Sequence, residues 1–476
     1  MRIAMIASEA APFVKTGGLG DVLQALPEAL AAIPHNELCV ILPCYRRVKE
    51  RYGDQLKLLT HFEVRLGWRH QYVGILKLQS RRKKLQYYFI DNEFYFGREG
   101  IYGYGDDGER FAYYSRAAMA ALAWLDFQPD IIHCHDWQTG LVPLFVRSEF
   151  ADTLGKAKLL FTIHNVEYQG WTDQWFFHDM LELPQWCFER LSMGASLNFM
   201  KGAIETSDRV STVSRTYAKE LLYSYYAHGM EQILQYNQGK LCGIVNGIDT
   251  TVFSPEKDNA LFHNYGIADF AQGKAANKAG IQKLCGLKVD PKVPMLAMIT
   301  RLAGHKGIDL LCYIMDELMQ EDVQFVLIGT GEQKYEQALK NYAAQYPGKL
   351  SVNLCFNTAF AAQLYAGADI YLMPSRSEPC GLSQLIAMHY GTVPVVNETG
   401  GLKDTVTPYC GDTGEGFTFQ SYNADDFLGA VHRALAVFRQ EPEAWEKLVT
   451  HDMAQDVTWE KPAQEYMKVY REMINE

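Results

Sequence analysis

Short apolar runs alternate with segments of helical periodicity along the whole chain. The first run, residues 1–8, is followed by a glycine-rich loop and by a helical pattern over residues 21–32. Other apolar runs of strand length occupy residues 37–42, 85–91, 130–133, 158–164, 294–300, 323–329, 369–374 and 393–397. Strands that alternate with helices predict parallel sheets, and the two series of runs predict an α/β protein with two doubly wound domains.

The interval between the two series sets the expected domain boundary. It contains Asn246, Gly247 and Ile248, ahead of a polar stretch at residues 254–259. We therefore expect an N-terminal domain at residues 1–245, a C-terminal domain at 246–455 and a terminal segment at 456–476. In open α/β sheets ligands bind beyond the carboxyl ends of the strands, so the reactive side chains should lie in loops that directly follow strands.

Charge and composition exclude several kinds of partner. The chain has 476 residues and a net charge of -11, without the positive field that nucleic acids and anionic membranes require. No run of about 18 apolar residues predicts a membrane span, and Glu9 and Lys15 interrupt the first run too early for a secretory signal. The ten cysteines form no C-x-x-C pair, which predicts reduced thiols in a cytoplasmic protein rather than a zinc site.

Lys15 and three glycines follow the first predicted strand. In the sequence Lys-Thr-Gly-Gly-Leu-Gly-Asp, Gly17 and Gly18 leave backbone N–H groups open, and the helix that follows adds positive potential. The loop matches neither the phosphate-binding P-loop nor the dinucleotide motif G-x-G-x-x-G. A plain tight turn and an anion site both fit the glycines, and Lys15 favours an anion site.

Two loops in the second half of the chain carry further charged residues. Arg301 and Lys306 follow the run at 294–300, and paired cations suit a diphosphate leaving group, on which charge develops as a sugar bond breaks. Glu378 follows the run at 369–374, where a carboxylate accepts sugar hydroxyls or stabilises an oxocarbenium-like centre. Solvated surface charges and a helix-capping carboxylate are the simpler alternatives for these residues.

Histidines end two predicted strands of the first half. His133 and His135 stand at alternate positions, followed by Asp136, so both imidazoles could share one face. A metal site is one interpretation, but no third ligand is apparent, and Asp136 as an acceptor from sugar hydroxyls fits better. His164 ends the next strand, where a hydrogen-bonded structural histidine is the alternative to a catalytic one. The sequence has no Asp-x-Asp triplet, so protein cations rather than a metal would neutralise a diphosphate.

Taken together, these loops resemble the signatures of the bacterial glycogen and starch synthase family, glycosyltransferase family 5. The matching segments follow the family order and occupy residues 15–22, 91–96, 100–103, 133–140, 163–170, 245–249, 300–302, 378–384 and 399–406. The resemblance implies a GT-B fold, in which two Rossmann-like domains face a cleft, with a helix in 456–476 that crosses back to the N-terminal domain. It also implies transfer of glucose from ADP-glucose to the non-reducing end of glycogen or a maltooligosaccharide, with retention and without metal or cofactor.

The family pattern also implies roles for individual residues. Those expected to act in catalysis are His164, Arg301, Lys306 and Glu378. Those expected to bind the donor or the glucan are Lys15, Gly17, Gly18, Tyr95, Asp136, Asn246, Phe356, Cys380, Gly381, Leu382 and Ser383. Phe356 would stack on the nucleobase, Ser383 would contact phosphate, and Asp136, His164 and Asn246 would line the glucose pocket.

The sequence departs from the family pattern in its second half. His305 stands in place of a usual Gln, Ser377 in place of Phe, and Asn397 in place of Arg, while Phe-Ala-Ala-Gln at 360–363 replaces a common Leu-Ala-His-Arg. Two alternatives therefore stay open beside an active ADP-glucose enzyme. One is a glucan-binding regulatory paralogue with weak or no activity, and the other is a GT-B glucosyltransferase that uses UDP-glucose.

Overall fold

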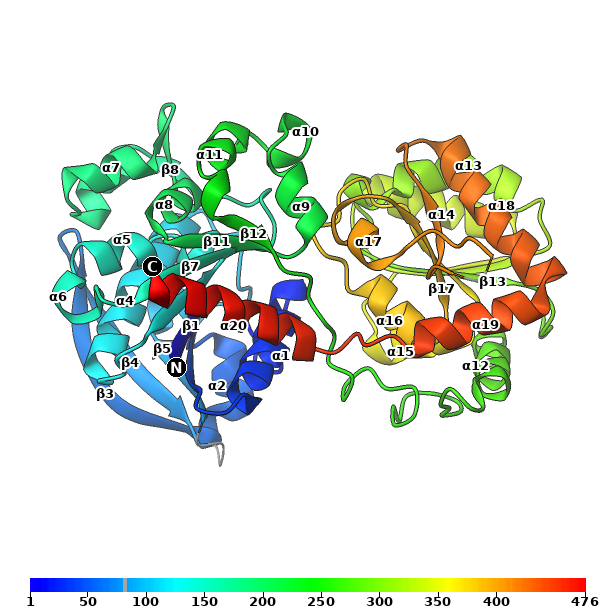
Figure 1. Cartoon of the computed structure of the whole chain (residues 1–476), viewed down its shortest axis with the longest axis horizontal. Helices are drawn as coiled ribbons and strands as arrows, with labels where there is room; N and C mark the ends of the chain where they lie inside the picture. Colours follow the sequence, from blue (N-terminus) through cyan, green and yellow to red (C-terminus); the bar gives the residue numbers. More distant parts are fainter. Residues whose placement is uncertain (80–83, 412) are drawn as a thin grey trace. The chain divides into compact units, whose positions relative to one another are not determined.

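The computed structural model describes residues 1–79, 84–411 and 413–476. These residues form two compact units (Figure 1). Unit 1 comprises Met1–Asn246 together with Trp459–Glu476, and unit 2 comprises Gly247–Thr458. Each unit has its own core of buried apolar side chains. Among the described helices, none is both long and apolar enough to cross a lipid bilayer.

The main sheet of unit 1 contains nine strands within the described residues. Their order across the sheet is β12 (Leu241–Gly243), β11 (Arg209–Thr212), β7 (Lys158–Ile163), β6 (Ile131–His135), β1 (Arg2–Ile6), β2 (Glu37–Pro43), β5 (Leu85–Asp91), β4 (Arg69–Leu78) and β3 (Leu56–Leu66). The strands from β12 to β5 pair in parallel. The apolar runs thus predicted β1, β2, β5, β6 and β7 to within a residue or two, whereas no run predicted β11 or β12.

At one edge, the otherwise parallel sheet of unit 1 carries antiparallel strands. Strands β3 and β4 form an antiparallel hairpin, and β4 also pairs antiparallel with β5. Buried and exposed positions are mixed along β3, where Lys57, Glu63 and Arg65 interrupt the apolar residues. A strand with one solvated face carries such polar positions, so a search for continuous apolar runs does not find it.

Helices and one small sheet complete unit 1. The small sheet pairs β8 (Trp171–Asp173) with β10 (Ser196–Asn198), and β10 with β9 (Ser192–Met193). The α-helices are α1 (Gly18–Ala32), α2 (Arg46–Tyr52), α3 (Glu93–Phe96), α4 (Asp107–Trp124), α5 (Val142–Arg147), α6 (Ala151–Leu154), α7 (Gln185–Leu191), α8 (Phe199–Thr206), α9 (Arg215–Glu220), α10 (Ser224–Ala227), α11 (Glu231–Tyr236) and α20 (Glu460–Asn475).

The last helix, α20, belongs to unit 1 although it follows unit 2 in the sequence. It packs against α1, as Figure 1 shows with α20 in red. Its buried side chains recur every three or four residues, which gives the helix one apolar face: Ala463, Tyr466, Met467, Tyr470 and Met473. Unit 1 is therefore built from two separate stretches of the chain.

Unit 2 is a parallel sheet flanked by helices. The strand order in the described residues is β15 (Leu350–Asn353), β14 (Gln324–Ile328), β13 (Met295–Ile299), β16 (Ile370–Met373), β17 (Val393–Asn397) and β18 (Phe417–Phe419), with every pairing parallel. The α-helices are α12 (Phe270–Leu284), α13 (Ile308–Leu318), α14 (Gln333–Gln345), α15 (Thr358–Gly367), α16 (Ser383–His389), α17 (Gly400–Thr405), α18 (Ala424–Gln440) and α19 (Pro442–Met453).

Each main sheet has a point where the direction of winding reverses. In unit 1 the chain winds from β1 to β2 and β5 on one side, and continues with β6 and β7 on the other. In unit 2 it winds from β13 to β14 and β15, and then returns to β16 beside β13. Loops that leave the strands at such a switch point diverge to opposite faces, which opens a crevice for ligands. The loops after β1, β6, β13 and β16 are therefore where a site is expected.

Candidate active site

The loops after β13 and β16 bring Lys306 and Glu378 into contact in unit 2. Nζ of Lys306 donates a hydrogen bond of 2.6 Å to Oε2 of Glu378, and the hydroxyl of Ser375 donates to the same oxygen at 3.0 Å. Glu378 is buried, and the Lys306 side chain is mostly covered. The pair places a fixed cation and a carboxylate side by side at the switch point of the sheet.

Backbone contacts between the two loops hold this pair in place. Gly307 has a φ of 76°, and a Cβ there would lie 2.2 Å from the carbonyl oxygen of Pro374. Only glycine allows the loop that carries Lys306 to pass so close to the end of β16. Next to it, the amide of Arg376 donates to the carbonyl of His305 at 2.8 Å.

The loop after β17 supports Glu378 from another side. The amide of Gly401 donates to the carbonyl oxygen of Glu378 at 3.0 Å. A Cβ at Gly400, where φ is +47°, would lie 1.9 Å from the same oxygen. Asn397, at the end of β17, is buried and donates from Nδ2 to the carbonyl of Ser375 at 2.9 Å. The asparagine that stands here in place of the usual arginine therefore stabilises the Glu378 loop through this hydrogen bond.

Cys380, Gly381, Leu382 and Ser383 form the turn from this loop into α16. Cys380 is buried, and Gly381 has a φ of +73°. Nε2 of Gln384 donates to the carbonyl oxygens of Cys380 and Gly381 at 3.2 and 2.9 Å. Within the described residues, the amides of Gly381 and Leu382 donate to no backbone carbonyl. The turn thus presents N–H groups that suit an anion or a sugar hydroxyl.

Arg301 and Phe356 lie in two other loops of unit 2, after β13 and after β15. Arg301 follows β13 directly, is exposed and has no ion-pair partner among the residues that the structure describes. Phe356 lies between β15 and α15 with 89% of its surface exposed. An exposed guanidinium and an exposed aromatic ring are the groups that bind phosphate and stack on a planar base.

In unit 1, the loop after β1 places Lys15 and the glycine backbone at the surface. Lys15, Gly17 and Gly18 are exposed, and Nζ of Lys15 pairs with Asp21 at 2.6 Å. No heavy atom beyond its neighbours lies within 4 Å of a Cβ built on Gly17, so its backbone faces open space.

The buried carboxyl group of Glu9 forms hydrogen bonds with this loop. Its Oε2 accepts hydrogen bonds from the amide of Thr16 at 2.5 Å and from the hydroxyl of Thr16 at 2.9 Å. Burial raises the pKa of Glu9 to about 7, although the two bonds from Thr16 oppose the shift. Glu9 lies three residues after β1, in the kind of loop where a site was expected, but its sequence context shows no partner for it.

The loop after β6 connects Asp136 to His164. Oδ1 of Asp136 accepts hydrogen bonds from the amides of His164 at 2.7 Å and Asn165 at 3.4 Å. Burial raises the pKa of Asp136 to about 7, with a smaller contribution from the charge of nearby Glu9. Burial also lowers the pKa of His164 to about 3, so the imidazole is neutral. Asn246 is buried, and its Oδ1 has no partner in the described part of the chain.

His133 and His135 share one side of β6, as their alternation predicts. Their ring centroids lie 4.0 Å apart. Both nitrogens of His133 are hydrogen-bonded, Nδ1 to the hydroxyl of Tyr470 at 2.8 Å and Nε2 to that of Thr162 at 2.6 Å. His133 is therefore a structural histidine rather than a metal ligand. Nδ1 of His135 bonds to Nε2 of His164 at 3.0 Å, a contact between strands that spacing along the sequence does not reveal.

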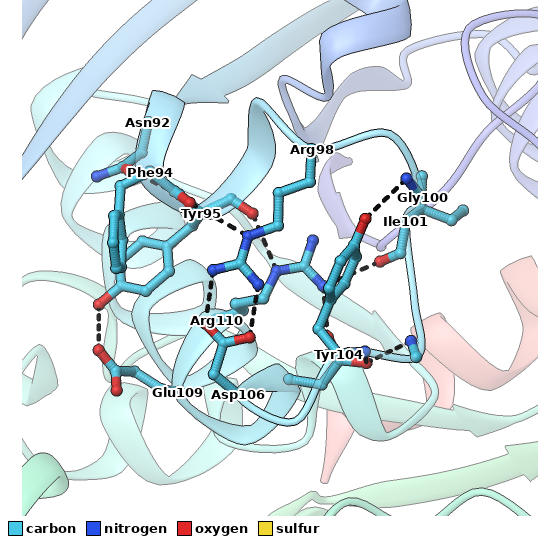
Figure 2. A network of polar contacts seen from close by, with 12 residues as sticks. Asn92, Phe94, Tyr95, Arg98, Gly100, Ile101, Tyr104, Asp106, Glu109 and Arg110 are labelled. Carbon is cyan, nitrogen blue, oxygen red and sulfur yellow. Dashed lines mark hydrogen bonds and ion pairs between the residues drawn. The ribbon is translucent and has the colours of Figure 1, made fainter.

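Tyr95 anchors the loop between β5 and α4 (Figure 2). Its ring is completely buried, and its hydroxyl donates to Glu109 at 2.7 Å. Arg110, also completely buried, donates to the carbonyl oxygens of Tyr95 at 2.9 Å and Ile101 at 3.2 Å, and pairs with Asp107. The side chain of Tyr95 thus has no surface exposed to a sugar in this structure, and it fixes the loop instead.

Comparison with known proteins identifies the family. The description "Starch synthase catalytic domain" matches residues 2–236, and "Glycosyl transferases group 1" matches residues 286–447. Glycogen synthase of Clostridioides difficile (strain 630) is 43% identical over 485 residues, covering 100% of both chains. Glycogen synthase of Bacillus cereus (strain Q1) is also 43% identical, over 480 residues and 100% of both chains.

Solved structures agree with this family. The catalytic domain of Starch Synthase IV from Arabidopsis thaliana, bound to ADP and acarbose, matches with a TM-score of 0.90 and 33% identity, over 100% of this chain and 99% of that chain. Sucrose-phosphate synthase from Thermosynechococcus elongatus shares the fold, with a TM-score of 0.60 at 18% identity and the same coverage. The two units are those of a GT-B glycosyltransferase. Within that class, the chain belongs to the glycogen and starch synthase family.

Proposed function

We propose that this protein transfers glucose from ADP-glucose to the non-reducing end of an α-1,4-glucan, with retention of configuration, in glycogen biosynthesis. The observation that carries the proposal is the Lys306–Glu378 pair at the switch point of unit 2, in a chain 43% identical to a glycogen synthase over its full length. The departures at His305, Ser377 and Asn397 leave this pair in contact, which favours an active enzyme over a binding protein.

In this proposal, unit 2 binds the nucleotide and stabilises the leaving group. The bond between C1 of glucose and the phosphate oxygen breaks, and negative charge develops on the diphosphate. Arg301 and Lys306 neutralise that charge. A cation stabilises the transition state most when the protein holds it in place before the reaction. The amides of residues 380–382 and the carboxylate of Glu378 bind the transferred glucose, Ser383 contacts phosphate, and Phe356 stacks on the nucleobase.

Unit 1 contributes a further set of contacts in this proposal. Asp136, His164 and Asn246 bind the hydroxyls of the transferred glucose, because each offers a polar side chain at the end of the parallel strands. Lys15 and the amides of Gly17 and Gly18 bind the diphosphate. The new bond forms between C1 and the 4-hydroxyl oxygen of the acceptor glucan, whose proton passes to the departing diphosphate. Tyr95 acts indirectly, by fixing the loop that it anchors.

A donor comparison tests the proposal. The purified chain would be supplied with glycogen and either ADP-glucose or UDP-glucose, while released nucleoside diphosphate and labelled glucan are measured. We expect elongation with ADP-glucose and products that α-amylase digests. Turnover confined to UDP-glucose would assign a different donor, and glucan binding without release of either diphosphate would indicate a regulatory paralogue. A cytoplasmic location is part of the proposal, and cell fractionation would check it.

A further inference from the structure

Three imidazoles form a row behind the proposed glucose site of unit 1. His133 and His135 of β6 are completely buried, whereas His164, at the end of β7, is partly exposed. Nδ1 of His135 lies 3.0 Å from Nε2 of His164, and the centroids of the His135 and His133 rings lie 4.0 Å apart with an interplanar angle of 37°. The row thus leads from the proposed site into the core of unit 1.

The far end of the row is held by α20, the last helix of the chain. The hydroxyl of Tyr470, a completely buried residue, lies 2.8 Å from Nδ1 of His133. Within the described residues that hydroxyl has no other hydrogen-bond partner. Tyr470 must therefore donate, because a buried O–H without an acceptor is costly. His133 then carries its proton on Nε2 and donates it to Thr162, whose hydroxyl lies 2.6 Å from that of Ser211.

The hydrogen-bond partners of His135 also show which of its nitrogens carries the proton. Its Nε2 is buried and has no partner among the described residues. A proton there would leave an N–H group unsatisfied, so the proton belongs on Nδ1, which donates to Nε2 of His164. A neutral His164 that accepts at Nε2 must carry its own proton on Nδ1. That nitrogen has no hydrogen-bond partner in the described residues and is free to donate to a ligand.

We propose that Tyr470 and His135 are positioning residues, which hold His164 as the neutral Nδ1–H tautomer that donates to a hydroxyl of the transferred glucose. The inference rests on the proposed function for the identity of the sugar. It makes α20 a support of the glucose site, although no residue of α20 needs to touch the substrate. Tyr470 acts by orienting His133, whose ring in turn confines that of His135.

Paired variants test this arrangement in the full-length protein. Tyr470→Phe keeps the ring and removes the hydroxyl, and we expect kcat/KM for ADP-glucose to fall about 2- to 10-fold, the range of one net hydrogen bond. His135→Leu removes the donor to His164 and should lower kcat/KM at least as much. His135→Asn places an amide N–H near the position of Nδ1 and should restore most of the loss. Glu465→Gln, which removes a surface ion pair of α20 with Arg215, is the matched control and should leave kcat/KM unchanged.

The tautomers are read directly from 15N chemical shifts of histidine-labelled protein. We expect a protonated Nδ1 and a bare Nε2 for His164, with changed shifts in Tyr470→Phe and His135→Leu. If the wild type turns over ADP-glucose but neither variant changes activity or the His164 shifts, the positioning role is wrong. If the wild type transfers no glucose, the proposed function fails, and the shifts alone then decide whether the row fixes this tautomer.

Discussion

Nζ of Lys306 lies 2.6 Å from Oε2 of Glu378, and the hydroxyl of Ser375 donates to the same carboxylate oxygen. The pair joins the loops after β13 and β16, the two strands where the sheet of unit 2 reverses its winding. A mostly covered ammonium group with a fixed partner needs little reorganisation when charge develops nearby. This contact therefore leads to predictions about both the activity and the stability of the protein.

Replacing Lys306 with alanine should remove most turnover. We expect kcat to fall by about 10²- to 10³-fold, because a preorganised group that stabilises the charge of the leaving diphosphate is lost. The measurement is the initial rate of ADP release with glycogen as acceptor. Lys340→Ala, at an exposed position of α14, is the control and should keep wild-type rates. Full activity in Lys306→Ala would show that this cation does not act on the leaving group.

A methyl group at Gly401 should distort the Glu378 loop. Its Cβ would lie 1.9 Å from the carbonyl oxygen of Cys380, which is backbone and cannot yield without moving the loop. We expect Gly401→Ala to lower kcat at least about 10-fold, because misplacement of roughly 1 Å is enough to cost about 10²-fold. The control is Gly429→Ala, in the interior of α18 and free of close contacts, which should stabilise unit 2 by about 0.5–1 kcal/mol. Equal activity in the two variants would contradict the packing argument.

The buried carboxyl of Glu9 should make the stability of unit 1 depend on pH. Its pKa is raised from 4.5 to about 7, so the folded state keeps the proton over a range where the unfolded chain has lost it. The stabilisation that this bound proton gives the folded state is complete below about pH 4.5 and is lost as the pH rises towards about 7. In Glu9→Gln, the free energy of unfolding should fall by roughly 1–3 kcal/mol less between pH 5 and 8 than in the wild type. Urea unfolding at each pH measures it. The raised pKa of Asp136 also makes stability fall with rising pH, so some pH dependence remains in Glu9→Gln. If the pH dependence of the unfolding free energy is unchanged in Glu9→Gln, the role of Glu9 is refuted.

Loss of the buried guanidinium of Arg110 should loosen the loop that Tyr95 anchors. Arg110→Met leaves Asp107 and two carbonyl oxygens without their donor, and we expect unit 1 to lose about 3 kcal/mol. Hydrogen exchange of the amides in α3 and α4 measures the effect locally. The exposed ion pair of Arg46 with Glu50 offers the comparison, since Arg46→Met should change stability by less than about 0.5 kcal/mol.

The sequence predicted the central strands because their apolar runs are continuous. It missed β3 and β4, where residues such as Lys57 and Glu63 face solvent and break the run. It also missed four strands of three or four residues, β11 and β12 in unit 1 and β15 and β18 in unit 2. A strand with one solvated face carries polar residues as loops do, and a strand of three or four residues is too short for its apolar run to stand out.

The sequence placed the candidate site residues in loops that follow strands, but it did not predict their partners. Lys306 and Glu378 stand 72 positions apart, and only the order of strands in the sheet brings them together. The same holds for Glu9 beneath the glycine loop, and for His135 beside His164. Asn397 looked like a lost cation in the sequence, whereas in the structure it braces the loop that carries Glu378.

The discontinuity of unit 1 also orders events during synthesis. Residues 459–476 leave the ribosome after the rest of both units, and they include Tyr470, whose hydroxyl bonds to His133. Unit 2 is a continuous stretch and is complete before that moment, so the part of the protein that is translated first finishes folding last. A chain that lacks residues 459–476 therefore exposes the apolar surface that α20 covers.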